Sequence, residues 1–185
     1  MEIKLSESSF INPPHKVEDS MKEAKKSFYE LAQGRIKYLN SKEFRKYQEE
    51  HRPMPNYYTN ASYVICRSYT KNDEGKVTKK WIKNLEIIID KDGFSVNGKD
   101  YSDIIPFAIE HEIYEAWMCA KKGVGHDMDL HDRHLLAVRR ECRLAEDNEL
   151  GDRWLEFNSL KDPASSELYR TTLEKIRKNP NSFKN

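Results

Sequence analysis

Two short patterns in the second half of the chain combine histidine and glutamate at helical spacing. His111 and Glu115 lie four residues apart, and His134 and Glu141 lie seven apart. Side chains at these separations project from the same face of an α-helix. Imidazole nitrogen and carboxylate oxygen are suitable ligands for Zn²⁺, and also for Fe²⁺ or Mn²⁺. The spacing therefore predicts one metal ion shared by two helices, with His111, Glu115, His134 and Glu141 as its ligands.

The neighbours of these residues on each helical face are mostly apolar. They are Ile104, Phe107, Ala108 and Met118 beside His111, and Leu130, Ala137 and Ala145 beside His134. A carboxylate buried among such residues is costly unless it is paired, hydrogen-bonded or bound to a cation. Two helices that each bury a histidine and a glutamate can solve this problem together by sharing one ion.

The same four residues are also compatible with an arrangement that holds no metal. In a chain with 34% charged residues, a His-x-x-x-Glu pattern can arise by chance on a helix surface. A histidine on an apolar face can also be a hydrogen-bonded core residue, so the four residues could form a polar cluster. Between the two patterns, His126 or His131 could replace Glu141 as a ligand. The coincidence of an acid on the histidine-bearing face of both helices favours the metal.

Helices are expected before, around and after these residues. Apolar residues recur at alternating spacings of four and three from Val17 to Leu31 and predict a helix that ends at Gly34. Pro106 is tolerated in the first turn of the helix that carries His111, and Gly123 ends that helix. The expected helices are 17–34, 41–50, 102–122, 127–150 and 165–178.

Strands are expected between the second and third of these helices. Residues 61–70 and 77–90 are rich in β-branched and aromatic types with period-two alternation, and a polar turn separates them. A short third strand is expected within 94–102, with a turn at Asn97-Gly98. The sequence therefore predicts an α+β fold with a small antiparallel sheet. We divide it into an N-terminal helical segment (1–60), a core (61–178) and a disordered tail (179–185).

Length, charge and cysteine content limit the classes of protein to consider. The 185 residues carry 32 basic and 31 acidic side chains, so the net charge of +1 gives no reason to expect broad attraction to nucleic acid or to anionic membranes, although a local basic patch is not excluded. Cys119 and Cys142 fall in helical patterns and are expected to be reduced core residues. No run approaches the ~20 apolar residues of a membrane span. We expect a cytoplasmic, soluble protein.

The strands and the helix that follows them resemble the core of zincin-like metalloproteins, in which a small sheet lies behind a helix carrying HExxH. The wider HExxE…HxxAxxxE pattern also resembles small uncharacterised bacterial and phage proteins with metal sites. The matching residues are His111, Glu112, Glu115, His134, Ala137 and Glu141. The resemblance covers about 60–145. It implies that Glu112 activates metal-bound water, while Glu115 stands where the family has its second histidine.

Three functions follow from these patterns. The first is a zinc-dependent hydrolase, for example a peptidase, acting on a peptide or small molecule with Glu112 as the general base. The second is a structural or regulatory metal protein in which the ion ties two helices together. The third is a binding module without metal. A di-iron bundle is disfavoured, because its Glu-x-x-His motifs are missing and the strands do not fit it.

Overall fold

The structure, a computed structural model, describes residues 14–51, 60–75, 77–121 and 130–183. Its elements are α1 (Pro14–Gln33), β1 (Ile36–Leu39), α2 (Ser41–His51), β2 (Ala61–Lys71), β3 (Val77–Asp90), the 3-10 turn η2 (Asp92–Phe94), β4 (Ser95–Val96), β5 (Lys99–Asp100), the 3-10 turn η3 (Ser102–Ile104), α3 (Ile105–Lys121), α4 (Leu130–Asp147), α5 (Gly151–Lys161) and α6 (Ser166–Lys178). The predicted α+β class is confirmed. The first three residues of the helix expected at 127–150 lie outside the described residues.

The main sheet has three strands in the order β1-β3-β2. β2 pairs antiparallel with β3, but β1 pairs parallel with it, from Ile36 opposite Ile87 to Leu39 opposite Asp90. The sheet is therefore mixed, not antiparallel as predicted, because the four residues of β1 are too few to show a strand pattern in the sequence. The third strand expected within 94–102 is not in this sheet. It forms a separate hairpin, β4-β5, around Asn97 and Gly98, which both have positive φ angles.

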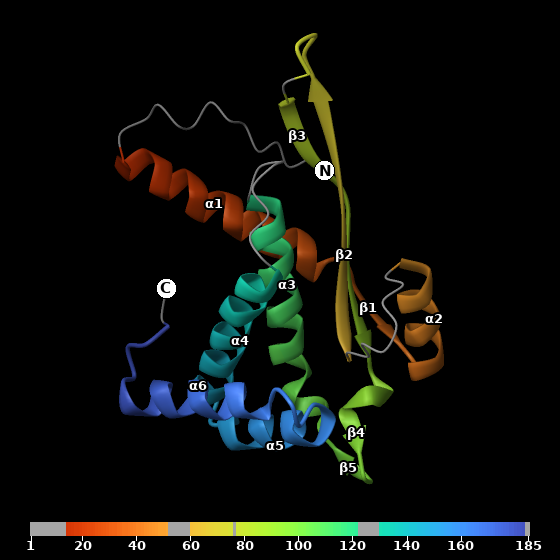
Figure 1. The fold of residues 1–185 in the computed structure, drawn as a ribbon, viewed down its shortest axis with the longest axis vertical. Coiled ribbons are helices and arrows are strands. Elements are labelled where there is room, and N and C mark those ends of the chain that lie inside the picture. Colours follow the sequence, from red (N-terminus) through yellow and green to blue (C-terminus); the bar gives the residue numbers. More distant parts are fainter. Residues whose placement is uncertain (1–13, 52–59, 76, 122–129, 184–185) are drawn as a thin grey trace.

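The β2-β3 hairpin is long for a domain of this size, since β2 has 11 residues and β3 has 14. β1 pairs only with the last four residues of β3. The distal half of the hairpin is consequently a two-stranded ribbon, which projects beyond the helices (Figure 1).

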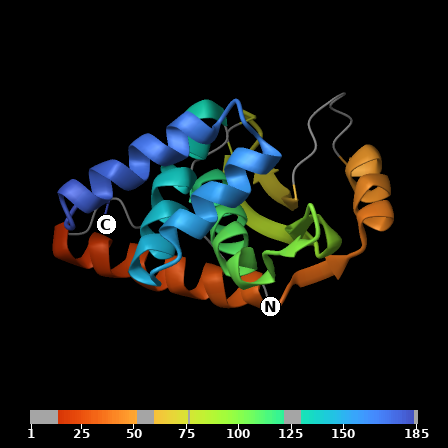
Figure 2. The same cartoon turned by 90° about the horizontal axis from the view of Figure 1, so that it is seen from below.

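Most helices lie on one side of the sheet. α3 lies next to the sheet, α1 and α4 lie against α3, and α5 and α6 cover the far end of this group (Figure 1). The view from below shows α2 on the opposite side of the sheet (Figure 2). No helix within the described ranges is long and apolar enough to cross a membrane.

The core lies between the sheet and α3. Leu85, Ile87 and Ile89 alternate along β3 and are buried, and Ile113 and Trp117 of α3 are buried as well. Alternating residues of a strand share one face, so β3 presents a continuous apolar surface to the helix layer. This packing fixes the rotation of α3 about its axis and hence the direction of its polar residues.

A second group of buried aromatic residues joins α5 to the rest of the fold. Phe94 and Phe157 stack with ring centroids 5.1 Å apart, and Phe107 meets Trp154 edge-on at 5.8 Å. Gly151 directly follows the helix expected at 127–150, in a stretch where no helix is expected. It is instead the first residue of α5.

The predicted division into an N-terminal segment (1–60), a core (61–178) and a tail (179–185) stays a prediction. α1 packs on α3, with the rings of Phe28 and Trp117 5.4 Å apart, so this N-terminal helix contributes to the core. Near the C-terminus, Arg143 Nη1 donates a hydrogen bond to the carbonyl oxygen of Pro180 (2.6 Å).

Candidate metal centre

α3 carries two of the predicted ligands on the face that meets α4. Pro106 stands in the first turn of α3, where its missing N–H has no helical partner to lose. His111 and Glu115 follow on one face, and both are buried, with 8% and 7% of their surface exposed. Because Ile113 and Trp117 hold the other side of α3 in the core, these polar side chains must point towards the neighbouring helix.

α4 approaches α3 through small buried residues. Ala137, Cys142 and Ala145 of α4 are fully buried. Small side chains allow two helices to pack closely. His134 and Glu141 lie on the same side of α4, and Glu141 is 1% exposed. Close packing of the two helices thus brings all four predicted ligands together.

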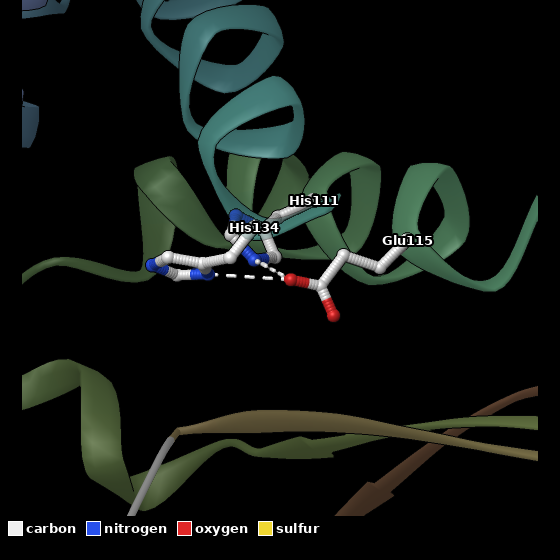
Figure 3. Close-up of side chains that lie close together, drawn as sticks. All are labelled: His111, Glu115 and His134. Atoms are coloured by element: carbon white, nitrogen blue, oxygen red, sulfur yellow. Dashed lines mark hydrogen bonds and ion pairs between the residues drawn. The ribbon is translucent and has the colours of Figure 1, made fainter. Parts of the chain in front are cut away.

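Three of these side chains converge on one oxygen atom. Glu115 Oε1 lies 3.2 Å from His111 Nε2 and 3.2 Å from His134 Nδ1 (Figure 3). The potential ligand atoms of His111, Glu115 and His134 all lie within 4.8 Å of one another. The two imidazole rings come from different helices, with their centroids 4.9 Å apart.

Glu141 contacts the opposite side of the His111 ring. Its Oε2 atom lies 2.9 Å from His111 Nδ1 and accepts a hydrogen bond from it when that nitrogen carries the proton. The ring then turns an unprotonated Nε2 towards Glu115 Oε1. Neutral imidazole nitrogen and carboxylate oxygen both carry lone pairs, so this contact requires a cation between them, either a proton or a metal ion.

The electrostatics of the cluster show the same need for positive charge. Burial opposes ionisation of Glu115, but hydrogen bonds from His111 and His134 lower its pKa to about 2. Burial also opposes charge on His111, yet the neighbouring carboxylates of Glu141 and Glu115 raise its pKa well above the usual value. The cluster therefore favours a positive charge beside these carboxylates, carried either by a proton on His111 or by a metal ion.

Two observations test whether a divalent ion suits these residues. A tetrahedral ion with ligand bonds of about 2.0–2.1 Å separates its ligand atoms by about 3.3 Å. The two nitrogen-to-oxygen distances at Glu115, 3.2 Å each, are close to this spacing, and the two imidazole nitrogens lie within 4.8 Å of each other. In addition, Glu141 Oε1 is buried and has no hydrogen-bond partner among the described residues. His111, Glu115 and His134 therefore form a mostly buried group that could hold a metal ion.

The structure says less about the other residues that were predicted to belong to the site. Glu112 is buried beside His111, and its charge contributes to the raised pKa of that histidine. His126 lies outside the described residues. For His131 the structure describes only the backbone, in the first turn of α4. Their suggested roles as alternatives to Glu141 stay predictions.

The structure adds neighbours that the sequence alone did not connect to the site. On α3, one turn after Glu115, the Cys119 sulfur lies 3.2 Å from the Tyr63 hydroxyl of β2 and also contacts Arg133. In the sequence, the only sign of these contacts is that Arg133 directly precedes His134. Cys119 and Cys142 are buried thiols outside any disulfide, which confirms them as reduced core residues.

A separate polar network lies on the α1 side of α3. Glu110 accepts a hydrogen bond from the Tyr29 hydroxyl (3.0 Å) and is paired with Arg140. Arg140 also lies over the rings of Tyr29 and Tyr114, with its guanidinium carbon 5.8 and 5.4 Å from their centroids. Because these groups satisfy one another, we assign the network to helix packing.

Comparison with known proteins leaves the site to be judged on its own chemistry. No family profile, curated protein or solved structure matches this chain. The case for a metal centre accordingly rests on the geometry of His111, Glu115 and His134.

Proposed function

We propose that this protein is a zinc-dependent hydrolase of the zincin-like type, with His111, Glu115 and His134 as the ligands. The observation that carries the proposal is the convergence of two imidazole nitrogens on Glu115 Oε1 at 3.2 Å. Catalytic zinc sites commonly have three protein ligands, often two histidines and one glutamate, and leave one position open. Fe²⁺ and Mn²⁺ accept the same donor atoms.

The position of Glu141 supports a three-ligand site. A histidine that binds a metal usually donates its other ring nitrogen to a carboxylate or carbonyl, which orients the ring and increases its basicity. Glu141 Oε2 occupies this position beside His111 Nδ1. We therefore assign Glu141 to the orientation of His111 and not to the ligand set.

Glu112 is the candidate general base. It is adjacent to His111 in the chain and buried to the same extent. A bound ion would supply Lewis-acid activation of water and of the substrate carbonyl. Glu112 would accept a proton from the water and pass it to the leaving group. A peptide is the favoured substrate class, because β2 is an edge strand and such strands can pair with an extended peptide.

Two measurements test this proposal. Elemental analysis of protein purified without added metal or a histidine tag should find close to one zinc per chain, and the His111→Ala/His134→Ala double variant should lose it. Glu112→Gln should keep the zinc and lose hydrolysis of a quenched fluorescent peptide library. Full hydrolysis by Glu112→Gln would remove the assigned role of Glu112.

One observation favours a second function, a structural metal site without turnover. Glu141 Oε1, which has no hydrogen-bond partner in the part of the chain that the structure describes, could become a fourth ligand and close the coordination shell if the Glu141 side chain left His111 Nδ1 for the side of the ring that faces Glu115. Zinc would then be present at one per chain, and no library peptide would be cleaved. Glu141→Gln would in that case release the zinc outright instead of weakening its binding.

A further inference from the structure

The distal part of the β2-β3 hairpin has a composition unlike the rest of the chain. We define the hairpin arm as residues 67–71 of β2 and 77–83 of β3. Its two strands contain five basic residues and no acidic one: Arg67, Lys71, Lys79, Lys80 and Lys83. The turn that joins the strands carries Asp73 and Glu74 as well as Lys76. Without residues 67–83, the chain has 26 basic and 29 acidic residues. The net charge of the chain is near zero because a basic hairpin is combined with an acidic remainder.

The arm extends beyond the helix that covers the sheet. Cys119, two residues before the end of α3, contacts Tyr63 near the start of β2. β2 continues for eight more residues after Tyr63. At about 3.4 Å per residue, the seven arm residues of β3 span roughly 20 Å. Figure 1 shows this ribbon projecting past α1 and α3.

The register places the basic residues on both strands of the arm. Arg67 lies opposite Ile82, Tyr69 opposite Lys80, and Thr70 opposite Lys79. β1 begins its pairing with β3 only at Ile87, and among the described strands none pairs with either outer edge of the arm. An isolated two-stranded ribbon is only marginally stable in water. A ribbon of this kind gains stability when a partner covers it.

We propose that the hairpin arm binds the phosphodiester backbone of a nucleic acid, with duplex DNA as the form that suits it best. Clustered lysine and arginine on one element are typical of phosphate contacts. A two-stranded β-ribbon fits the major groove of B-DNA, which is about 12 Å wide. This proposal is independent of the metal centre.

A charge-matched pair of variants provides the test. The arm variant replaces the five basic residues of the arm with glutamine. The control variant replaces five exposed lysines on other elements, namely Lys42, Lys46, Lys161, Lys175 and Lys178. Both variants have the same total charge, so a difference in binding must come from the position of the charges. Circular dichroism confirms the fold of each.

Binding is measured by fluorescence anisotropy with a labelled duplex of about 20 base pairs at about 50 mM salt. We expect the wild type and the control to bind, and the arm variant to bind at least about tenfold more weakly. If four phosphates are contacted, wild-type affinity should fall about 100-fold between 50 and 200 mM salt. Single-stranded RNA, measured in parallel, distinguishes the two forms of nucleic acid: tighter binding of RNA would overturn the preference for duplex DNA.

Several outcomes would overturn the proposal. One is no binding of DNA or RNA by the wild type, and another is equal loss in both variants. Binding to anionic lipid vesicles through the arm, without binding to nucleic acid, would assign the arm to a membrane surface instead. Aggregation of the arm variant, with no nucleic-acid binding by the wild type, would show that the lysines only protect the strand edges. If the arm variant does not fold, Arg67→Gln/Lys71→Gln and Lys79→Gln/Lys80→Gln/Lys83→Gln are tested separately.

Discussion

His111 and Glu141 are joined by a hydrogen bond of 2.9 Å between Nδ1 and Oε2, although 30 residues separate them in the chain. The contact crosses from α3 to α4, and both residues are buried. It determines which nitrogen of His111 faces Glu115. The candidate metal centre therefore depends on a residue that is hydrogen-bonded to one of its three proposed ligands.

Glu141→Gln should weaken zinc binding about 10- to 100-fold, because an amide lacks the charge that makes His111 a better ligand. Competition with a chromophoric zinc chelator measures the change. Glu49→Gln, an exposed carboxylate on α2, is the control and should bind zinc like the wild type. Unchanged affinity in Glu141→Gln would show that this hydrogen bond does not tune the site.

Removing the metal should lower thermal stability. Zinc at 100 times its dissociation constant adds about 2.7 kcal/mol to the free energy of unfolding. For a chain of this size that corresponds to a rise in Tm of about 5–10 °C. Differential scanning calorimetry in EDTA and in zinc measures the shift. The His111→Ala/His134→Ala variant should show no shift, and an equal shift in it would place the zinc elsewhere.

Phe157→Ala should destabilise the fold by about 3–5 kcal/mol, because it leaves a cavity among buried aromatic rings. Phe157 is 3% exposed and stacks on Phe94. Leu160 on the same helix is 45% exposed, so Leu160→Ala should change the free energy of unfolding by only about 0.5 kcal/mol. Urea unfolding compares the two. Similar losses would mean that the α5 aromatic cluster is not part of the core.

Gly93→Ala should also destabilise the fold, by about 1–3 kcal/mol. A Cβ atom at Gly93 would lie 2.7 Å from Asn60 Oδ1 and 2.8 Å from Asp90 Oδ2. Asp90 cannot easily move, since Ser41 Oγ and the Gly93 N–H both donate hydrogen bonds to it. The control is Gly34→Ala, whose Cβ would make only ordinary contacts. Equal melting temperatures for the two variants would contradict the predicted clash.

Local patterns were sufficient to predict the long elements. The apolar periodicity around His111 and His134, with Pro106 at one end, located α3 and α4 and the face on which they meet. The alternation along β2 and β3 likewise located the hairpin. In each case the pattern extends over ten or more residues, so a few atypical positions do not obscure it.

Features that depend on distant contacts could not be predicted in this way. β1 has four residues, and its parallel pairing is made with a strand about 50 residues later. α5 follows α4 after three residues, and no helix was expected there although Trp154 and Phe157 mark a new buried face. The position of Glu141 on α4 could be predicted, but its hydrogen bond to His111 depends on how closely the two helices pack.

Glu115 and His134 are 19 residues apart in the chain, and the connection between α3 and α4 lies between them. An ion held by both would act as a cross-link that closes this loop. In the chain-entropy treatment of disulfides, closing a loop of about 15 residues contributes about 3 kcal/mol. The ion can be held only after α4 has docked on α3, so metal content would serve as a gauge of tertiary assembly. Substitutions far from the ligands that loosen this docking would release the ion as surely as loss of a histidine.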